Sequence, residues 1–382
     1  MNCASLNTFF SCSFKQEDLE VNNFFKAICE GLELDTRNIS EGYSETPPEV
    51  AKNLIGSSSL VIAILTKREK GNDRSWSIST AVNQEISMAF TLDKPTLLIV
   101  EEGVKLDGFT DNYGTYLSFD RDNLFNTEFL KKTIKSLHAI RMKSMDMNNL
   151  LPTDAAGYYA KTINMLIELT KEDSVPLWKY NTSRELVFTK DFNGQIKNVA
   201  WVDTLPPEAT ELIDHKIDFD LSDSEAEVSI NELTNTPSKL EIAIGFSETV
   251  KKDEVIKINF EYKSKYFSLI TKEKGIRYEP HIIEDKHFDA LDGMIPIQPT
   301  KEMLLQFRFP SWYKLKKDSL FPFVASYSGG IDYLALSELE RCQVDITEFA
   351  GTIIVNIKIE NPLMRHVYGL AWNIKDENEN SQ

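Results

Sequence analysis

Six consecutive apolar residues, LVIAIL at positions 60–65, restrict the possible folds more than any other stretch of the chain. A strand without polar positions must be covered on both faces, which is typical of parallel sheets packed between helices. A second apolar run, TLLIV at 96–100, follows Lys94-Pro95. Because parallel neighbours need crossover connections, usually helices, the two runs predict alternating strands and helices in this part of the chain.

Weaker signals complete this pattern. The predicted strands cover residues 8–12, 33–36, 60–65, 96–100 and 116–119. Apolar residues at helical spacing lie between them, and Thr46-Pro47-Pro48-Glu49 indicates a helix start, with threonine as N-cap and proline in the first turn. We therefore predict that residues 1–145 form an α/β domain with a flavodoxin-like, five-stranded parallel sheet.

Beyond residue 145 the pattern changes twice. Residues 146–176 carry apolar residues at helical spacing and are predicted to be a helical connector that ends at Pro176. From residue 177 to residue 382, apolar and polar residues alternate in short runs such as Val255–Tyr262 and Ile353–Ile359. This alternation predicts an antiparallel β-sandwich region, either one large sandwich or two small ones. The motifs of this region indicate no particular chemistry.

Composition excludes several classes of protein. The net charge of −17 argues against general binding to nucleic acid or to anionic membranes, because both would repel the chain. No apolar run approaches the roughly 20 residues of a membrane span, and we recognise no signal peptide, so we expect a cytoplasmic protein. The four cysteines show no CxxC spacing and are interpreted as reduced thiols. The five histidines are scattered, and we expect no metal site.

Glu85 is the most unusual residue of the predicted helix before the 96–100 strand. Ala81, Val82, Ile86 and Ala89 make this helix largely apolar, yet a carboxylate stands among them. Periodicity alone allows Glu85 to face water from the polar side of the helix. The alternative is a functional carboxylate, since open α/β sheets bind ligands at the carboxyl ends of their strands.

Several segments of residues 1–145 resemble TIR (Toll/interleukin-1 receptor) domains. The stretch FFSCSFKQED at 9–18 is similar to the opening strand and loop of these domains, and residues 37–48 stand where they have their BB loop. The stretch IGSSSLVIAILT at 55–66 is similar to the segment in which a helix ends and the central strand begins.

Two further segments extend this resemblance, which covers under half of the chain. AVNQEISMA at 81–89 resembles the helix that carries the catalytic glutamate of TIR enzymes. Lys94-Pro95 before a buried strand, followed by EEGV at 101–104, resembles prokaryotic members. One position departs from the pattern: enzymatic members commonly have tryptophan four residues before the glutamate, where this chain has Ala81, and the nearest tryptophan is Trp76.

The resemblance implies that Glu85 is catalytic and that the chain cleaves the bond between nicotinamide and ribose in NAD⁺. Cleavage leaves an oxocarbenium-like ribose, which an anion beside the ring would stabilise. NAD⁺ is then the substrate, and no cofactor is expected.

Five more residues are candidates for substrate binding. Phe9 or Phe10 could stack on a ring of NAD⁺, although both also fit a hydrophobic core. Arg37 could pair with a phosphate, because a guanidinium matches phosphate oxygens in a fork, or it could be a solvated loop charge. Ser13 and Trp76 stand on predicted loops that could line the site.

A TIR-like domain ahead of an unrelated β-rich region resembles the arrangement of bacterial anti-phage effectors. The chain is therefore expected to be an NAD⁺ glycohydrolase or cyclase, and a homo-oligomer, activated when residues 177–382 bind an unknown ligand or protein. The main alternative is a non-enzymatic TIR scaffold that recruits other TIR or defence proteins, with Ala81 marking a lost site. A third reading is base exchange or deoxyribosyl transfer on nucleosides, which uses a related fold and also a glutamate.

Overall fold

The computed structural model divides the chain into two compact units, Ala4–Leu151 and Pro152–Gln382, the second also including Met1–Cys3. The structure describes residues 6–39, 47–70, 75–106, 116–147, 157–173, 175–202, 212–220, 227–236, 239–265, 288–326, 333–364 and 366–375. Most of the predicted BB loop, residues 40–46, lies outside the described residues. Among the helices that are described, none has the length and apolarity needed to span a lipid bilayer.

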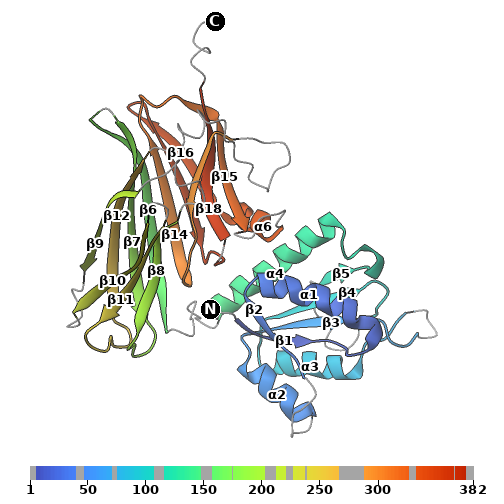
Figure 1. Cartoon of the computed structure of the whole chain (residues 1–382). Helices are drawn as coiled ribbons and strands as arrows, with labels where there is room; N and C mark the ends of the chain where they lie inside the picture. The colour runs from blue at the N-terminus through green and yellow to red at the C-terminus, as the bar shows by residue number, and fades with distance from the viewer. Residues whose placement is uncertain are drawn as a thin grey trace, which may run out of the picture. The chain divides into compact units, whose positions relative to one another are not determined.

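The first unit is built on a five-stranded parallel sheet, which confirms the sheet predicted from the sequence (Figure 1). Its strands are β1 (Leu6–Ser11), β2 (Leu34–Arg37), β3 (Leu60–Leu65), β4 (Thr96–Glu101) and β5 (Leu117–Phe119). They pair in the order β2-β1-β3-β4-β5, one of the two common orders of doubly wound sheets. Every residue of the LVIAIL strand is buried, as its composition predicts. The strand order reverses between β1 and β3, so these two strands flank the position where ligands bind in such sheets.

Helices cover both faces of this sheet. They are α1 (Leu19–Gly31), α2 (Pro47–Ser57), α3 (Thr80–Thr91) and α4 (Thr127–Met147), with short 3₁₀ turns η1 (Gln16–Asp18) and η2 (Arg121–Asn123). Figure 1 shows α1 and α4 on one face and α2 and α3 on the other. The ring of Phe25 on α1 contacts Phe119 on β5 and Phe129 on α4, which joins the first pair of helices to the sheet.

The helical connector predicted for residues 146–176 is wrong. Helix α4 ends at Met147, and residues Tyr158–Glu172 form strand β6, followed directly by β7 (Val175–Phe188). The apolar residues of this segment fit both spacings, because Ile163, Met165, Ile167 and Leu169 alternate while other apolar residues fall between them. Pairing decides between the two: β6 is hydrogen-bonded to a strand on each side, and burial alternates along it.

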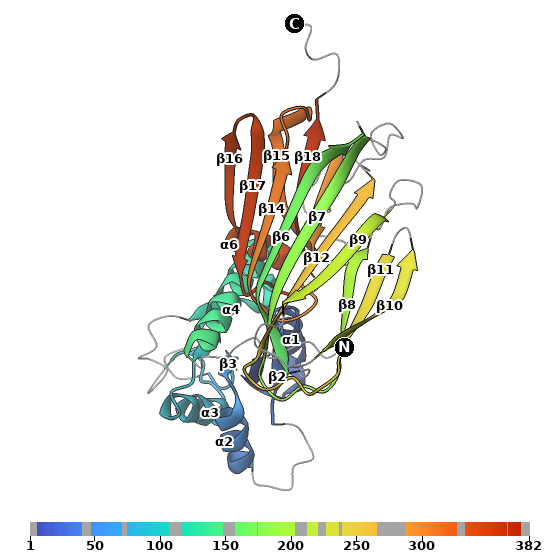
Figure 2. The same cartoon turned by 90° about the vertical axis from the view of Figure 1, so that its left-hand side faces the viewer.

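The second unit consists of three sheets (Figure 2). Its remaining elements are β8 (Gln195–Val202), β9 (Leu212–Asp220), β10 (Val228–Thr236), β11 (Lys239–Phe246), β12 (Val255–Lys265), β13 (Ala290–Met294), β14 (Thr300–Phe309), β15 (Leu315–Ser326), α6 (Tyr333–Arg341), β16 (Gln343–Phe349), β17 (Thr352–Glu360) and β18 (His366–Ile374). A seven-stranded sheet has the order β16-β17-β14-β6-β7-β12-β9, and three-stranded sheets have the orders β13-β18-β15 and β10-β11-β8. The pairing is antiparallel as predicted, except that β6 and β14 are parallel.

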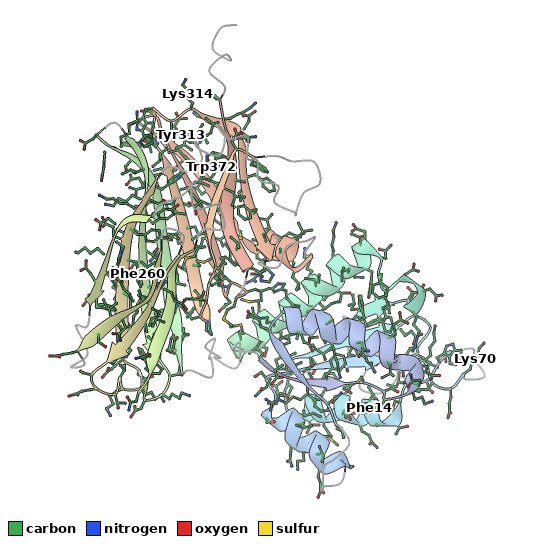
Figure 3. The ribbon with its side chains drawn as sticks, in the orientation of Figure 1. Phe14, Lys70, Phe260, Tyr313, Lys314 and Trp372 are labelled. Carbon is green, nitrogen blue, oxygen red and sulfur yellow. The ribbon has the colours of Figure 1, made fainter. Side chains whose placement is uncertain are left out.

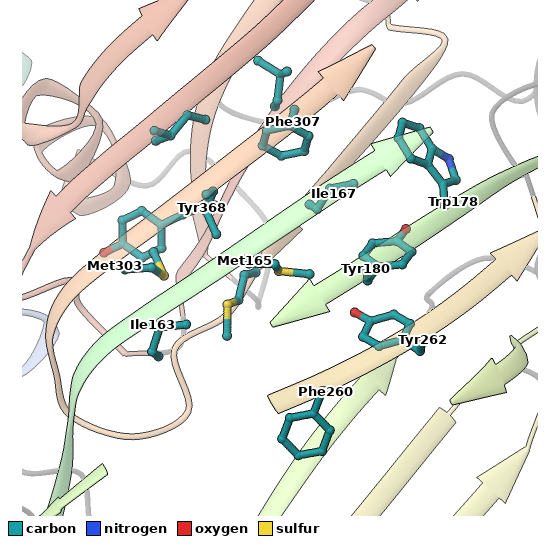
Figure 4. Packing of buried hydrophobic residues seen from close by; sticks show 14 of the residues in the cluster. Ile163, Met165, Ile167, Trp178, Tyr180, Phe260, Tyr262, Met303, Phe307 and Tyr368 are labelled. Carbon is teal, nitrogen blue, oxygen red and sulfur yellow. The ribbon is translucent and has the colours of Figure 1, made fainter. Parts of the chain in front are cut away.

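One continuous hydrophobic core joins the three sheets, so the region is a single large β-structure rather than two small sandwiches. Figure 4 shows the part of this core between the seven-stranded sheet and Tyr368 of β18. Trp178 and Phe188 show how the sheets share it, because both point to the same face of β7. The ring of Trp178 contacts Trp372 on β18, and the ring of Phe188 contacts Phe246 on β11. Trp372 also donates a hydrogen bond of 2.8 Å from Nε1 to the hydroxyl of Tyr313, and both residues are labelled in Figure 3.

Candidate functional site

Glu85 lies on the buried side of helix α3, with an exposed fraction of only 8%. The Oγ atom of Ser11 donates a hydrogen bond of 2.5 Å to the Oε2 atom of Glu85. Ser11 is the last residue of β1, so this contact fixes the carboxylate at the carboxyl edge of the sheet. Because β1 pairs with β3, Glu85 stands beside the point where the strand order reverses.

The surroundings of Glu85 alter the protonation of two groups. Burial raises the pKa of the Glu85 carboxyl, and the hydrogen bond from Ser11 partly opposes this change. Burial likewise raises the pKa of the Cys12 thiol to about 11. The positive charge of Lys26 and a hydrogen bond from Asn38 oppose this rise, whereas the negative charge of Glu85 adds to it. Cys12 is therefore a neutral thiol. It forms a cluster with Ser11 and Glu85, hereafter the Glu85 cluster, and Asn38 connects the end of β2 to this cluster.

Phe9 and Phe10 belong to the core of the first unit. Their exposed fractions are 1% and 0%, so neither ring has a free face for a substrate in this structure. Phe9 packs against Ala51, Ile55, Val61 and Ala89, on the face covered by α2 and α3. These neighbours explain why both rings are buried and not available for stacking, because a strand of a doubly covered sheet buries both of its alternating sets of side chains.

Arg37 and Trp76 lie at the same sheet edge as Glu85, on opposite sides of it. Arg37 is the last residue of β2, and its half-exposed side chain pairs with Asp35 at 2.9 Å. The backbone of Trp76 bonds to the end of β4, where it donates to the Gly103 carbonyl at 3.1 Å. β4 is two positions from β1 in the sheet, a separation of about 10 Å. The backbone of Trp76 thus lies beside the segment that follows β4, and not at the end of β1.

Ser13 lies on the loop that follows β1, one residue beyond the Glu85 cluster. Its Oγ atom accepts a hydrogen bond of 3.2 Å from the Lys15 backbone, and its carbonyl accepts one of 2.7 Å from Asn22. It also hydrogen-bonds the Asp18 carboxylate. These contacts direct Ser13 toward a second group of charged residues at the edge.

This second group is an ion cluster of Asp18, Arg68, Glu101 and Arg121, hereafter the edge ion cluster. Asp18 is fully buried and pairs with both Arg68 and Arg121, the latter at 2.5 Å. Arg121 also donates from Nε to Glu101 at 2.8 Å, and Glu101 accepts a backbone hydrogen bond of 2.9 Å from Lys67. The cluster thus ties together the segments that follow β1, β3, β4 and β5.

Sequence reasoning missed the edge ion cluster, although a signal for it exists. Arg68, Glu101 and Arg121 all lie within three residues of the end of a predicted strand. Because the carboxyl ends of parallel strands meet at one edge, charges at these positions can be expected to lie together.

The site as described offers a buried carboxylate, a hydroxyl and a neutral thiol at the carboxyl edge of β1. Such a carboxylate can accept hydrogen bonds or stabilise a cation in surroundings of low dielectric. In the described part of the chain, no group of three or more histidine, cysteine, aspartate or glutamate residues is placed to hold a metal ion.

No family model matches the sequence, and neither does any curated protein. Similar solved structures include an M1 zinc metallopeptidase from Deinococcus radiodurans, 7% identical, with a TM-score of 0.30 over 56% of this chain and 42% of that one. A variant of a two-domain M1 zinc metallopeptidase bound to L-tryptophan is also 7% identical, with a TM-score of 0.29 over 56% of this chain and 43% of that one. The chain thus spans less than half the length of these proteins. A likeness at such TM-scores carries no argument about function.

Proposed function

We propose that the chain is a cytoplasmic TIR-type NAD⁺ glycohydrolase, or a cyclase that makes an ADP-ribose signal, with Glu85 as its catalytic residue. The observation that carries the proposal is the buried Glu85 carboxylate, which Ser11 holds at the carboxyl edge of a central strand. The resemblance of residues 9–18 and 81–89 to TIR domains supplies the reaction class. The same resemblance suggests a role in bacterial anti-phage defence.

The proposed reaction needs an anion and little else from the protein. The bond between the ribose C1′ atom and the nicotinamide nitrogen breaks, and nicotinamide leaves as a neutral molecule with the bonding electron pair. Water then adds to the oxocarbenium-like ribose and loses a proton to solvent. Glu85 stabilises the cation, and burial strengthens this attraction because less water screens it.

The raised pKa of Glu85 fits this role. A carboxyl group whose pKa is raised by burial is less readily ionised in the free protein. The positive charge of the nicotinamide ring would favour the ionised form when NAD⁺ binds, since an opposite charge nearby lowers a carboxyl pKa. Substrate binding would therefore favour the ionised form that the reaction uses.

Control of the activity is assigned to the β-rich unit. Unregulated loss of NAD⁺ would kill the cell, so the enzyme must be inactive until a signal arrives. We assign the sensing of that signal, or the assembly that follows it, to residues 158–374, which form the three sheets on one core.

Substitution of Glu85 tests the catalytic assignment. Wild type and Glu85→Gln are each assembled and given NAD⁺. The variant is expected to release nicotinamide about 10²-fold more slowly than wild type, or slower still, because the amide has the same shape without the charge. Glu102→Gln is the matched control, since Glu102 is exposed and follows the end of β4. Nicotinamide release by Glu85→Gln at the wild-type rate would remove Glu85 from the mechanism.

A non-enzymatic TIR scaffold is the second candidate, and one observation favours it. Ala81, exposed on α3, stands where enzymatic members commonly have tryptophan, and the backbone of Trp76 is hydrogen-bonded beside the segment that follows β4. The scaffold predicts no nicotinamide release in any assembly state, together with capture of a TIR-containing partner. Nicotinamide release that depends on Glu85 would exclude it.

A further inference from the structure

Strand β16 is an edge strand whose core-facing side is only partly covered. It pairs on one side with β17, and in the described part of the chain it is the outermost strand of the seven-stranded sheet (Figure 2). Val344 and Ile346 lie opposite Ile357 and Val355, which are buried in the core. Yet Val344 is 40% exposed and Ile346 is 50% exposed. The apolar face of the sheet therefore extends beyond what covers it.

Strand β16 has only part of the usual protection of a free edge. Its seven residues, QVDITEF, include the charged Asp345 and Glu348 but no lysine and no proline, and its register with β17 runs without a bulge. The opposite edge strand, β9, is different: charged Asp214, Lys216, Asp218 and Asp220 alternate along it, and its pairing with β12 is irregular. Within the described residues, the β9 edge is thus more strongly protected against pairing than the β16 edge.

We propose that β16 pairs with β16 of a second copy of this chain, in antiparallel orientation about a two-fold axis through Ile346. Residues directly opposite each other in such a pair share one face of the sheet. The axis therefore places both apolar core faces on the same side. The two seven-stranded sheets would join into one, and each copy would help to cover the exposed Val344 and Ile346 of the other.

The charges of β16 select this register. With the axis through Ile346, the opposite pairs are Ile346 with Ile346, Asp345 with Thr347, and Val344 with Glu348, so no like charges meet. An axis through Asp345 would place two carboxylates opposite each other, and an axis through Thr347 would separate the two Ile346 side chains, which the axis through Ile346 brings together. Glu348 is already paired with Lys317 of its own chain at 2.5 Å, which further reduces repulsion between the carboxylates of the two β16 strands.

The hairpin that carries β16 favours such pairing. Ala350 and Gly351 connect β16 to β17, and both have positive φ, 50° and 78°, as in a two-residue type I′ turn. This turn type matches the twist of the strands and fixes their register. The edge is therefore presented in a defined conformation, and pairing requires little ordering of the chain.

Sedimentation velocity on the full chain tests the proposal. Wild type at micromolar concentrations is expected to have twice the 43.6 kDa mass of one chain, or a multiple of this pair. Ile346→Lys is expected to halve the mass, because two ammonium groups would stand directly opposite each other. Leu233→Lys is the matched control: Leu233 is 49% exposed on edge strand β10, at a register shift, and this change should leave the mass unaltered.

A charge exchange separates lost pairing from lost folding. Ile346→Glu alone should also halve the mass, and an equimolar mixture of Ile346→Lys and Ile346→Glu should restore it, because lysine then faces glutamate. A wild-type chain that stays monomeric, an Ile346→Lys variant with the wild-type mass, or a mixture that does not reassociate would each overturn the proposal. NAD⁺ takes no part in these measurements, so their outcome is independent of the glycohydrolase assignment.

Discussion

Ser11 connects the end of a central strand to a carboxylate on the neighbouring helix. The contact spans 74 residues of sequence, and it decides the direction of a side chain that helical periodicity would allow to face water. Cys12, the next residue, is buried beside the same carboxylate and stays protonated. A charged group on a mostly apolar helix is thus explained by one hydroxyl at the sheet edge.

Loss of the Ser11 hydroxyl should raise the pKa of Glu85 further. The hydrogen bond is the influence that lowers this pKa, so Ser11→Ala leaves burial unopposed. Carbon-detected NMR titration of the Glu85 carboxyl is expected to show its midpoint at higher pH in Ser11→Ala. If Glu85 acts as an anion, the acidic limb of the nicotinamide-release profile should move in the same direction. Ser13→Ala, whose hydroxyl accepts from Lys15, should leave the Glu85 midpoint in place.

At the scale of elements, the edge ion cluster holds four strand-following segments together. Asp18 and Glu101 supply the carboxylates, and Arg68 and Arg121 the guanidinium groups. Burial alone would raise the pKa of Asp18, but its hydrogen bonds to Arg121 and Arg68 hold the pKa below its usual range. The same opposition between burial and the Arg121 guanidinium lowers the pKa of Glu101.

These lowered pKa values predict a stability that is lost in acid. A carboxyl group whose pKa is lower in the folded than in the unfolded protein stabilises the folded state. This stabilisation is complete at pH values above the usual aspartate pKa of about 4, and it is lost as the pH falls through the pKa of the folded state. Urea unfolding at pH 7 should show Asp18→Asn less stable than wild type by about 3 kcal/mol, because two guanidinium groups lose their buried partner. The difference should shrink below about pH 4.

Asp35→Asn is the control for this prediction. Asp35 pairs with Arg37, but both side chains are largely exposed, so the pair should contribute less than about 1 kcal/mol. A loss at Asp18 no larger than the loss at Asp35, or a difference that persists unchanged into acid, would contradict the stabilising role of the edge ion cluster.

At the scale of the whole molecule, each unit has a hydrophobic core of its own, and the larger core depends on aromatic residues. Trp372 is fully buried, and its ring contacts Trp178 and Phe309, so it links β18 to the seven-stranded sheet. Two cores predict two transitions in scanning calorimetry. Trp372→Ala should destabilise the β-rich unit by about 3–5 kcal/mol and shift one transition only.

Trp312→Ala provides the comparison. Trp312 is 37% exposed, and its main contact is the Lys171 ammonium 4.0 Å from the ring centroid, so its removal should cost about 1 kcal/mol or less. A single transition in the wild-type protein would mean that the units unfold together, and equal shifts of two transitions would mean that their stabilities are coupled.

Local pattern was enough to predict much of the first unit. The strands at 60–65 and 96–100, the helix after Pro47 and the parallel sheet follow from apolar runs, proline and crossover rules, which act over a few residues. Residues 158–172 show where local pattern fails: their apolar positions suit a helix or a strand, and hydrogen bonds to β7 and β14 make them a strand.

The order of side chains along the chain is enough to specify which segments are apolar on one face or on two, and therefore which classes of sheet can form. Which polar groups meet depends instead on how the strands are arranged in the folded protein. Ser11 with Glu85, Asp18 with Arg121, and the free edge at β16 all depend on which strands become neighbours. The physical reason is that burial follows from the local order of side chains, whereas contacts between distant charges and hydroxyls exist only after strand order and register are fixed.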